Sequence, residues 1–244
     1  GVTKDIDGDY SLRMALQTRE QHIKRDRATS NICTAQVLLA VMAGMYAVYH
    51  GPKGLKEISK SIHLKAVYLK RNLESIGLKI KYSELYDTVT VLCDSKKIKE
   101  LACIKKINFC YLSDGEISIS VNEKTNLKDL KEIISVFEDF TRKVSTINEF
   151  PTDAEVTNER KSSILTHPVF SLYHSETSLM RYIKSLENKD MSLTQSMISL
   201  GSCTMKLNSA SEMIPLSWSE WNSIHPFVPI DQAKGYHEVI NRLE

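Results

Sequence analysis

The stretch PKGLKEISKSIHLKAVYLKRNLESIG, residues 52–77, decides how the centre of this chain folds. Its apolar side chains recur three and four positions apart, which is the spacing of a helix with one apolar face. That stripe consists of Leu55, Ile58, Ile62, Leu69, Leu73 and Ile76. Pro52 suits the first helical position, and Gly77 suits the position just past the last turn. The sequence therefore predicts one amphipathic helix between these two residues.

Strand patterns follow this helix. Short runs rich in β-branched residues predict strands near 78–82, 88–93, 107–112 and 116–121. Asp114-Gly115 predicts a two-residue hairpin between the last two strands. Helices are expected near 95–105 and, capped by Asn126, near 127–142. Residues 52–143 are thus predicted to form a compact α+β unit.

The flanking regions have different patterns. Residues 32–50 form an apolar helix with almost no polar face, which predicts burial on most sides. Residues 144–166 lose periodicity, gain polar character and are interpreted as a linker. An amphipathic helix is expected at 175–187 and a further helix at 230–244, and 190–208 is expected to be mostly extended or looped. The sequence therefore predicts a central unit, a linker and the start of a second unit.

Composition narrows the function classes. The 244 residues carry a net charge of +2, too close to neutral to argue for nucleic acid or an anionic membrane as a partner. Five cysteines, an odd number without a CxxC pair, favour a reducing compartment. No apolar run reaches the roughly 18 residues of a membrane span. The first residue is not Met and the last helix has no stop signal, so both ends are expected to be edges of a fragment.

Two polar segments are candidate anion sites. Thr29, Ser30 and Asn31 precede the apolar helix, and free N–H groups at a helix N-terminus attract anions. Simple capping of the helix explains the same residues equally directly. The basic residues of 19–27 could steer an anionic ligand, but Glu20 and Asp26 within them are also typical of a solvated charged surface.

The loop Gly201-Ser202-Cys203-Thr204-Met205-Lys206 is a candidate ligand contact. Its glycine permits close backbone approach, and its hydroxyls offer hydrogen bonds. Lys206 is a candidate amine for imine chemistry, which requires the lysine to be neutral. A turn with one surface lysine is the alternative. The histidines His167, His174 and His225 lack the paired spacing of a metal site, and no metal is expected.

Five strings together resemble one family closely: QTREQHIKRDRATSNICTAQ (17–36), YAVYHGPKGLK (46–56), LTHPVFSLYHSE (165–176), SMISLGSCTMKLN (196–208) and IHPFVPIDQAKGY (224–236). The family is glycine dehydrogenase (decarboxylating), the P-protein of the glycine cleavage system. The chain departs from its pattern at residues 107–110, and at Ser171 and Ser199, where Asn and Pro are expected.

The resemblance implies a fold and a domain plan. Family members consist of two fused halves, each with the type I fold of pyridoxal phosphate (PLP) enzymes. This chain would be an α/β fragment of such a fold with an α+β subdomain. Residues 1–50 would end the large domain of the first half, and 51–143 would form its small domain. Residues 144–166 would link the halves, and 167–244 would begin the second half.

The implied reaction is decarboxylation of glycine, in which PLP serves as the electron sink. The remaining aminomethyl group passes to the lipoyl arm of the H-protein. Other implied partners are the rest of the polypeptide and a second copy or half, as a homodimer or a two-half pseudo-dimer. Neither nucleic acid nor a membrane is implied. The location would be the cytoplasm in bacteria or the mitochondrial matrix in eukaryotes.

The resemblance also assigns residues. The lysine that carries PLP would lie beyond Glu244, so Lys206 would not be that lysine and the chain would be inactive alone. The implied cofactor contacts are Thr29, Ser30, Asn31, Ser202, Cys203 and Thr204. The implied substrate contacts are Lys206, Asn208 and His225. The alternative to an enzyme fragment is a noncatalytic interaction module, or a degenerate relative, with an anion-binding helix N-terminus.

Overall fold

The computed structural model describes residues 2–4, 6–12, 36–154, 160–189 and 210–244. A four-stranded antiparallel sheet lies at its centre, in the order β3-β4-β6-β5. The strands are β3 (Lys79–Ile80), β4 (Thr88–Leu92), β5 (Cys110–Ser113) and β6 (Glu116–Ser120). β5 and β6 form the predicted hairpin, with a register shift between Tyr111 and Ser113. All four expected strands are confirmed, although β3 has only two residues.

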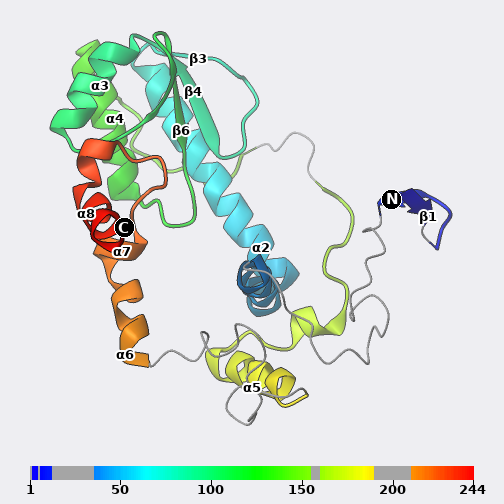
Figure 1. Ribbon diagram of the computed structural model, residues 1–244. Helices are drawn as coiled ribbons and strands as arrows, with labels where there is room; N and C mark the ends of the chain where they lie inside the picture. Colours follow the sequence, from blue (N-terminus) through cyan, green and yellow to red (C-terminus); the bar gives the residue numbers. More distant parts are fainter. Residues whose placement is uncertain (1, 5, 13–35, 155–159, 190–209) are drawn as a thin grey trace.

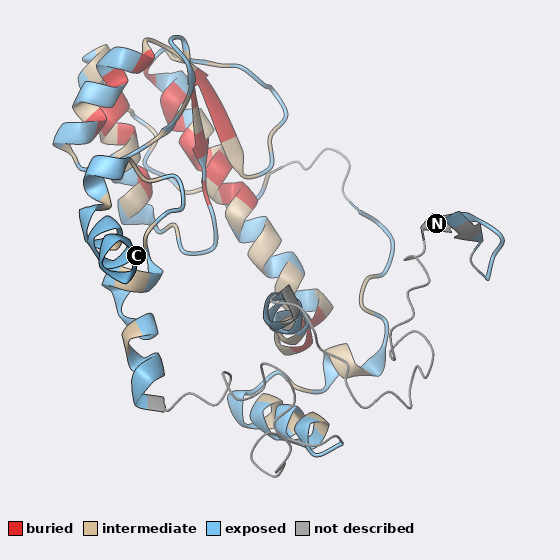
Figure 2. Ribbon diagram, in the orientation of Figure 1, coloured by how far each residue is buried: buried red, intermediate tan, exposed pale blue. Residues whose placement is uncertain are grey.

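The sheet packs with three helices, α2 (Gln36–Ser75), α3 (Ser95–Ile104) and α4 (Leu127–Thr141). Fully buried side chains come from the three helices, from Ile76 just after α2, and from β4 and β6. They include Leu69, Leu73, Ile76, Val89, Val91, Ile98, Ile117, Leu130 and Phe137. Asn126 caps α4 in a reciprocal capping box with Asp129, as its position predicts. The buried residues gather in this layer of sheet and helices (Figure 2). The predicted α+β unit is therefore the core of the chain.

Helix α2 contains a break at Gly51, whose φ of 61° and ψ of −177° are not helical. Its two parts run in different directions (Figure 1). Pro52 begins the second part, where its missing N–H costs nothing because the first N–H groups of a helix have no partner within it. The two helices expected on either side of Gly51 are thus confirmed.

The prediction that the first of these helices is buried on most sides is wrong for its described residues. Leu38 and Leu39 are each 67% exposed, and Met42 is 60% exposed. The apolar composition of this helix calls for a covering layer. No part of the described chain covers these side chains. The second part of α2, in contrast, packs on the sheet.

The start of the expected linker packs against the α+β unit. Ile147 and Phe150 lie against the core, and the rings of Tyr68 and Phe150 are 5.4 Å apart. Ser145 Oγ donates to Asn72 Oδ1 at 2.7 Å. The described residues between α4 and His167 contain no helix or strand, but the packing attaches their first part to α2.

The remaining described segments are short helices and one hairpin. They are β1 (Val2–Lys4), β2 (Tyr10–Leu12), η2 (Pro168–Ser171), α5 (Glu176–Glu187), α6 (Ala210–Met213), η4 (Ile214–Ser217), α7 (Ser219–Asn222), η5 (Ile230–Gln232) and α8 (Lys234–Leu243). α5 and α8 confirm the two helices predicted for these parts of the chain. The described residues from 160 onward are called the second region. No described residue after Pro151 is buried, so the segments of the second region make only partly exposed contacts (Figure 2). Within the described residues, no helix has the length and apolar content needed to span a bilayer.

Candidate functional site

Two of the segments that carry the family resemblance contact each other. The break in α2 lies within YAVYHGPKGLK, and η2 lies within LTHPVFSLYHSE. His174 Nδ1 is 2.6 Å from the carbonyl oxygen of Tyr49, so the ring N–H donates to that carbonyl. The contact joins residues 125 positions apart. Within the described residues, the break in α2 and η2 bring two of the five strings together.

Gly51 makes this close approach possible. A Cβ atom built on Gly51 would lie 2.6 Å from the carbonyl oxygen of Phe170 and 2.6 Å from Cε1 of His174. Both distances are shorter than any real Cβ contact, and one of the two atoms belongs to the backbone. Glycine also adopts a positive φ without the steric cost of a side chain. Only glycine at this position therefore satisfies both the backbone conformation and the contact.

A shallow hollow lies beside this contact at the start of α5. The rings of Tyr173 and Tyr182 stack there with centroids 4.1 Å apart. Ser175 caps α5 and forms a reciprocal capping box with Ser178. The hollow is lined by Tyr173, Ser175, Thr177, Ser178, Arg181, Tyr182 and Ser185. Ser175 and Ser178 are occupied in capping, and Ser185 Oγ donates to the carbonyl oxygen of Tyr182 at 2.7 Å. The hollow is therefore explained by helix initiation and ring packing.

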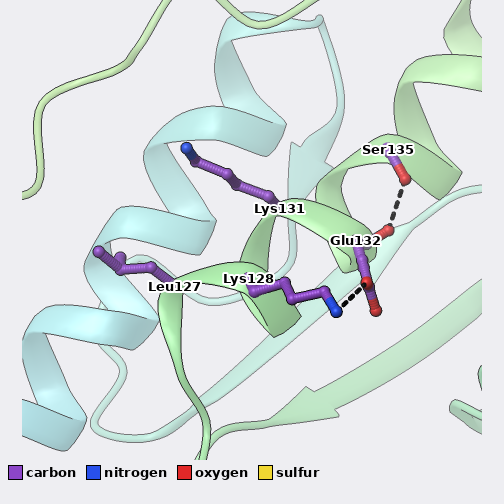
Figure 3. Close-up of a pocket in the computed structure, with 5 residues that line it drawn as sticks. All are labelled: Leu127, Lys128, Lys131, Glu132 and Ser135. Carbon is purple, nitrogen blue, oxygen red and sulfur yellow. Dashed lines mark hydrogen bonds and ion pairs between the residues drawn. The ribbon is translucent and has the colours of Figure 1, made fainter.

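A second hollow lies on the outer surface of α4 (Figure 3), lined by Leu127, Lys128, Lys131, Glu132 and Ser135. Lys128 pairs with Glu132 at 3.8 Å, and its side chain is 84% exposed. Ser135 Oγ donates to the carbonyl oxygen of Glu132 at 2.7 Å. Leu127, Lys128, Lys131 and Glu132 are all exposed, and Ser135 is only partly buried. This hollow is therefore a solvated helix surface.

Most of the sequence-predicted site residues lie outside the described residues. They are Thr29, Ser30, Asn31, Ser202, Cys203, Thr204, Lys206 and Asn208. The basic segment 19–27 lies outside them as well. The assigned cofactor and substrate roles of these residues therefore stay predictions.

His225 is described, and it is exposed. Its Nδ1 accepts the backbone N–H of Phe227 at 3.1 Å, and the two rings lie 5.9 Å apart. His167 makes the same local bond, with Nδ1 accepting from Val169 N at 3.2 Å. Both histidines precede a proline and use the imidazole to stabilise the turn that follows. A substrate contact for His225 stays a prediction.

His63 is buried and Cys93 is half-buried in the α+β unit. His63 Nδ1 is 3.0 Å from the carbonyl oxygen of Tyr86, while its Nε2 is buried without a hydrogen-bond partner. Burial, with a smaller contribution from the charge of Asp94, raises the pKa of the Cys93 thiol to about 11. Since the thiolate is the nucleophilic form, Cys93 is unreactive at neutral pH. Among the described residues, no group of three or more His, Cys, Asp or Glu side chains could hold a metal ion.

The sequence reasoning missed the partners at the α2 break. Gly51 and Pro52 signalled the break itself, but the helical period carries no information about which remote segment covers it. His174 was considered only as a metal ligand. The presence of both segments among the strings of the resemblance was the available signal.

Comparison with known proteins identifies the family. The family model described as Glycine cleavage system P-protein matches residues 1–137, which is more than half of the chain. The chain belongs to the glycine cleavage system P-protein family. This is the family that the five strings resemble, and the prediction is confirmed.

Relatives of this P-protein chain align over its whole length. A "Glycine dehydrogenase (decarboxylating)" of Christiangramia forsetii is 56% identical over 247 aligned positions, which cover 100% of this chain and 26% of the relative. A "Glycine dehydrogenase (decarboxylating), mitochondrial" of Gallus gallus is 49% identical and is covered to 25% of its length. The chain thus spans about a quarter of the length of these curated relatives.

One solved structure shows a weak likeness. It is an inhibitor-bound glycine decarboxylase (P-protein) of the glycine cleavage system, with 23% sequence identity and a TM-score of 0.39. The likeness covers 57% of this chain and 34% of that one. At this level it carries no argument about the fold, which is described here from the chain's own contacts.

Proposed function

We propose that this chain is one part of a PLP-dependent glycine decarboxylase. The observation that supports the proposal is the 56% identity, over the whole chain, to a protein named glycine dehydrogenase (decarboxylating). In the proposed enzyme, glycine loses its carboxyl group as carbon dioxide. The aminomethyl group then passes to the lipoyl arm of an H-protein, with the activity belonging to the longer polypeptide rather than to these 244 residues.

The described residues do not form a cradle for PLP. The side chains that line the two hollows described above are exposed or only partly buried. Lys128 of α4, which pairs with Glu132, is exposed to solvent. Among the described residues, the buried side-chain polar atom without a partner is His63 Nε2, which lies in the core unit, where the ring stacks on Tyr86 and Nδ1 faces the Tyr86 carbonyl. No catalytic step is therefore derived from the described residues.

The proposed contacts fall on two segments outside the described residues and on His225. Thr29, Ser30 and Asn31 would bind the cofactor phosphate through backbone N–H groups and hydroxyls at the start of an apolar helix. Ser202, Cys203 and Thr204 would contact the cofactor from a second loop. Lys206, Asn208 and His225 would contact the substrate. PLP, when bound, supplies the electron sink for decarboxylation.

The domain plan is part of the same proposal. Residues 1–50 complete a large domain, 51–143 form a small domain, 144–166 connect two halves and 167–244 begin the second half. The exposed apolar side chains of the first part of α2 and of α8 are consistent with surfaces that further layers of the longer protein cover. The active assembly would be a homodimer or a two-half pseudo-dimer. It would work in the cytoplasm of a bacterium or in the mitochondrial matrix of a eukaryote.

Borohydride reduction in the presence of PLP tests the lysine assignment. Intact mass and peptide mapping of the 244-residue chain should show only scattered, substoichiometric labelling of surface lysines. Lys206→Arg provides the matched control, and it should leave the labelling pattern of all other peptides unchanged. One stoichiometric adduct at Lys206 that disappears in Lys206→Arg would contradict the proposal, because this chain would then carry its own cofactor lysine.

A further inference from the structure

We propose that the break in α2 is a docking site for the segment 167–174 of the same chain, and that this contact anchors the second region to the α+β unit. The inference rests on the geometry at Gly51 and does not depend on the proposed enzymatic activity. It assigns a binding function to Tyr49 and Gly51 and identifies the ligand as a polypeptide segment with a turn and a terminal imidazole.

The break creates an acceptor for this ligand. The last four carbonyl groups before a helix end lack partners within the helix. The non-helical Gly51 follows Tyr49 by two residues and places the Tyr49 carbonyl among such groups. His174 Nδ1 donates to it at 2.6 Å. The docked segment therefore satisfies a main-chain acceptor that the break leaves open.

The break also provides the space that the segment occupies. Gly51 is buried although it lies at the bend of a largely exposed part of α2. The carbonyl of Phe170 and the ring of His174 occupy the position that a side chain on residue 51 would fill. His167 begins the turn by accepting from Val169 N, so the ligand segment has a fixed shape of its own. Acceptor, space and a preformed turn together make a specific contact.

The contact fixes where the second region begins. Ser175, the N-cap of α5, follows His174 directly. The second region is therefore connected to the α+β unit in two ways. One is the covalent linker between Ala154 and Arg160, and the other is the docked segment 167–174. If the docked segment is an anchor, the two regions stay together after the linker is cut.

The test replaces residues 155–159 with a protease recognition sequence in the full chain and cuts it after folding. Size exclusion and the fluorescence anisotropy of a label at the C-terminus then report whether the two pieces stay associated on dilution. Asn108→Ala/Gln232→Ala is used as the background, because this pair also joins the two regions. The pieces should remain associated in that background.

Variants at the break identify the cause of association. Gly51→Ala and His174→Leu should each raise the dissociation constant of the pieces about tenfold or more, which corresponds to about 1.4 kcal/mol, because one introduces a steric clash and the other leaves a carbonyl unpaired. Gly44→Ala is the matched glycine control, because nothing lies within 4 Å of its added Cβ. His174→Asn should bind like the parent, because its amide N–H replaces Nδ1–H.

Three results would overturn the inference. The cut pieces could separate in the Asn108→Ala/Gln232→Ala background at the concentrations used for folding. Gly51→Ala could bind like Gly44→Ala. His174→Asn could be as weak as His174→Leu, which would show that the hydrogen bond to Tyr49 does not contribute to docking.

Discussion

Asn108 and Gln232 exchange two side-chain hydrogen bonds although 124 residues separate them. Asn108 Nδ2 donates to Gln232 Oε1 at 2.7 Å, and Gln232 Nε2 donates to Asn108 Oδ1 at 3.2 Å. Asn108 precedes β5, and Gln232 ends η5. The pair holds the C-terminal segments near the α3 and α4 side of the core unit, where Figure 1 shows α7 and α8. The second region is thus attached at its start by His174 and near its end by Gln232.

The first prediction concerns this amide pair. Asn108→Ala and Gln232→Ala should each lower the unfolding free energy by about 0.5–1 kcal/mol, because a net hydrogen bond contributes an amount of this order. The double variant should lose less than the sum of the two, since both changes remove the same contact. Urea unfolding of the four proteins measures the coupling. Strict additivity would show that the two carboxamides do not interact in solution.

The second prediction concerns the start of α4. Asn126→Ala should destabilise the chain by about 1 kcal/mol, because it removes the acceptor for the N–H groups of Lys128 and Asp129. Asn126→Ser retains a capping oxygen and should be close to the parent in stability. Thermal unfolding compares the three proteins. Equal losses in both variants would rule out capping as the role of Asn126.

The third prediction concerns the Cys93 thiol. Its pKa is about 11 in the folded chain, raised by burial from an ordinary value of 9.0. The protonated thiol is favoured by folding, so its contribution is fully present below pH 9 and is lost as the pH rises toward about 11. Unfolding free energies should therefore fall more steeply over that interval in the parent than in Cys93→Ala. Parallel pH dependences in the two proteins would contradict the burial of this thiol.

The fourth prediction contrasts the two parts of α2. Leu73→Ala should cost about 3 kcal/mol, because Leu73 is fully buried in the core and its truncation leaves a cavity. Leu38→Ala and Met42→Ala should each change the unfolding free energy by less than about 0.5 kcal/mol, since both side chains are mostly exposed. Denaturant titrations measure all three. A large loss at Leu38 would restore the sequence-based expectation that this helix is buried within the chain.

The core unit was predictable because its elements have strong local signals. The stripe that includes Leu69, Leu73 and Ile76 fixes both the length and the buried face of the second part of α2. Asp114-Gly115 and Asn126 mark a turn and a helix start through their own backbone preferences. Each of these features depends on residues near one another in sequence, so one sequence suffices to find them.

The contacts between regions were not predictable in the same way. The apolar composition of residues 32–50 shows that the helix needs cover, but not that the cover is absent from the described chain. His174 and Gln232 contact partners more than 100 residues away, and neither lies in a periodic pattern that names its partner. The expected ligand contacts at 29–31 and 202–208 rest on the family resemblance, and the described residues do not test them.

The most direct test of the central claim is a segment exchange. The 244 residues replace the aligned segment of the Christiangramia forsetii relative, which is 56% identical to them. The chimaera is assayed for carbon dioxide release from carboxyl-labelled glycine with PLP and lipoylated H-protein, and circular dichroism confirms that it folds. The host protein without the segment is the negative control. Glycine-dependent release by the chimaera, lost in the control, is the predicted result. A folded chimaera that binds PLP but releases no carbon dioxide would contradict the assignment of this chain to a glycine decarboxylase.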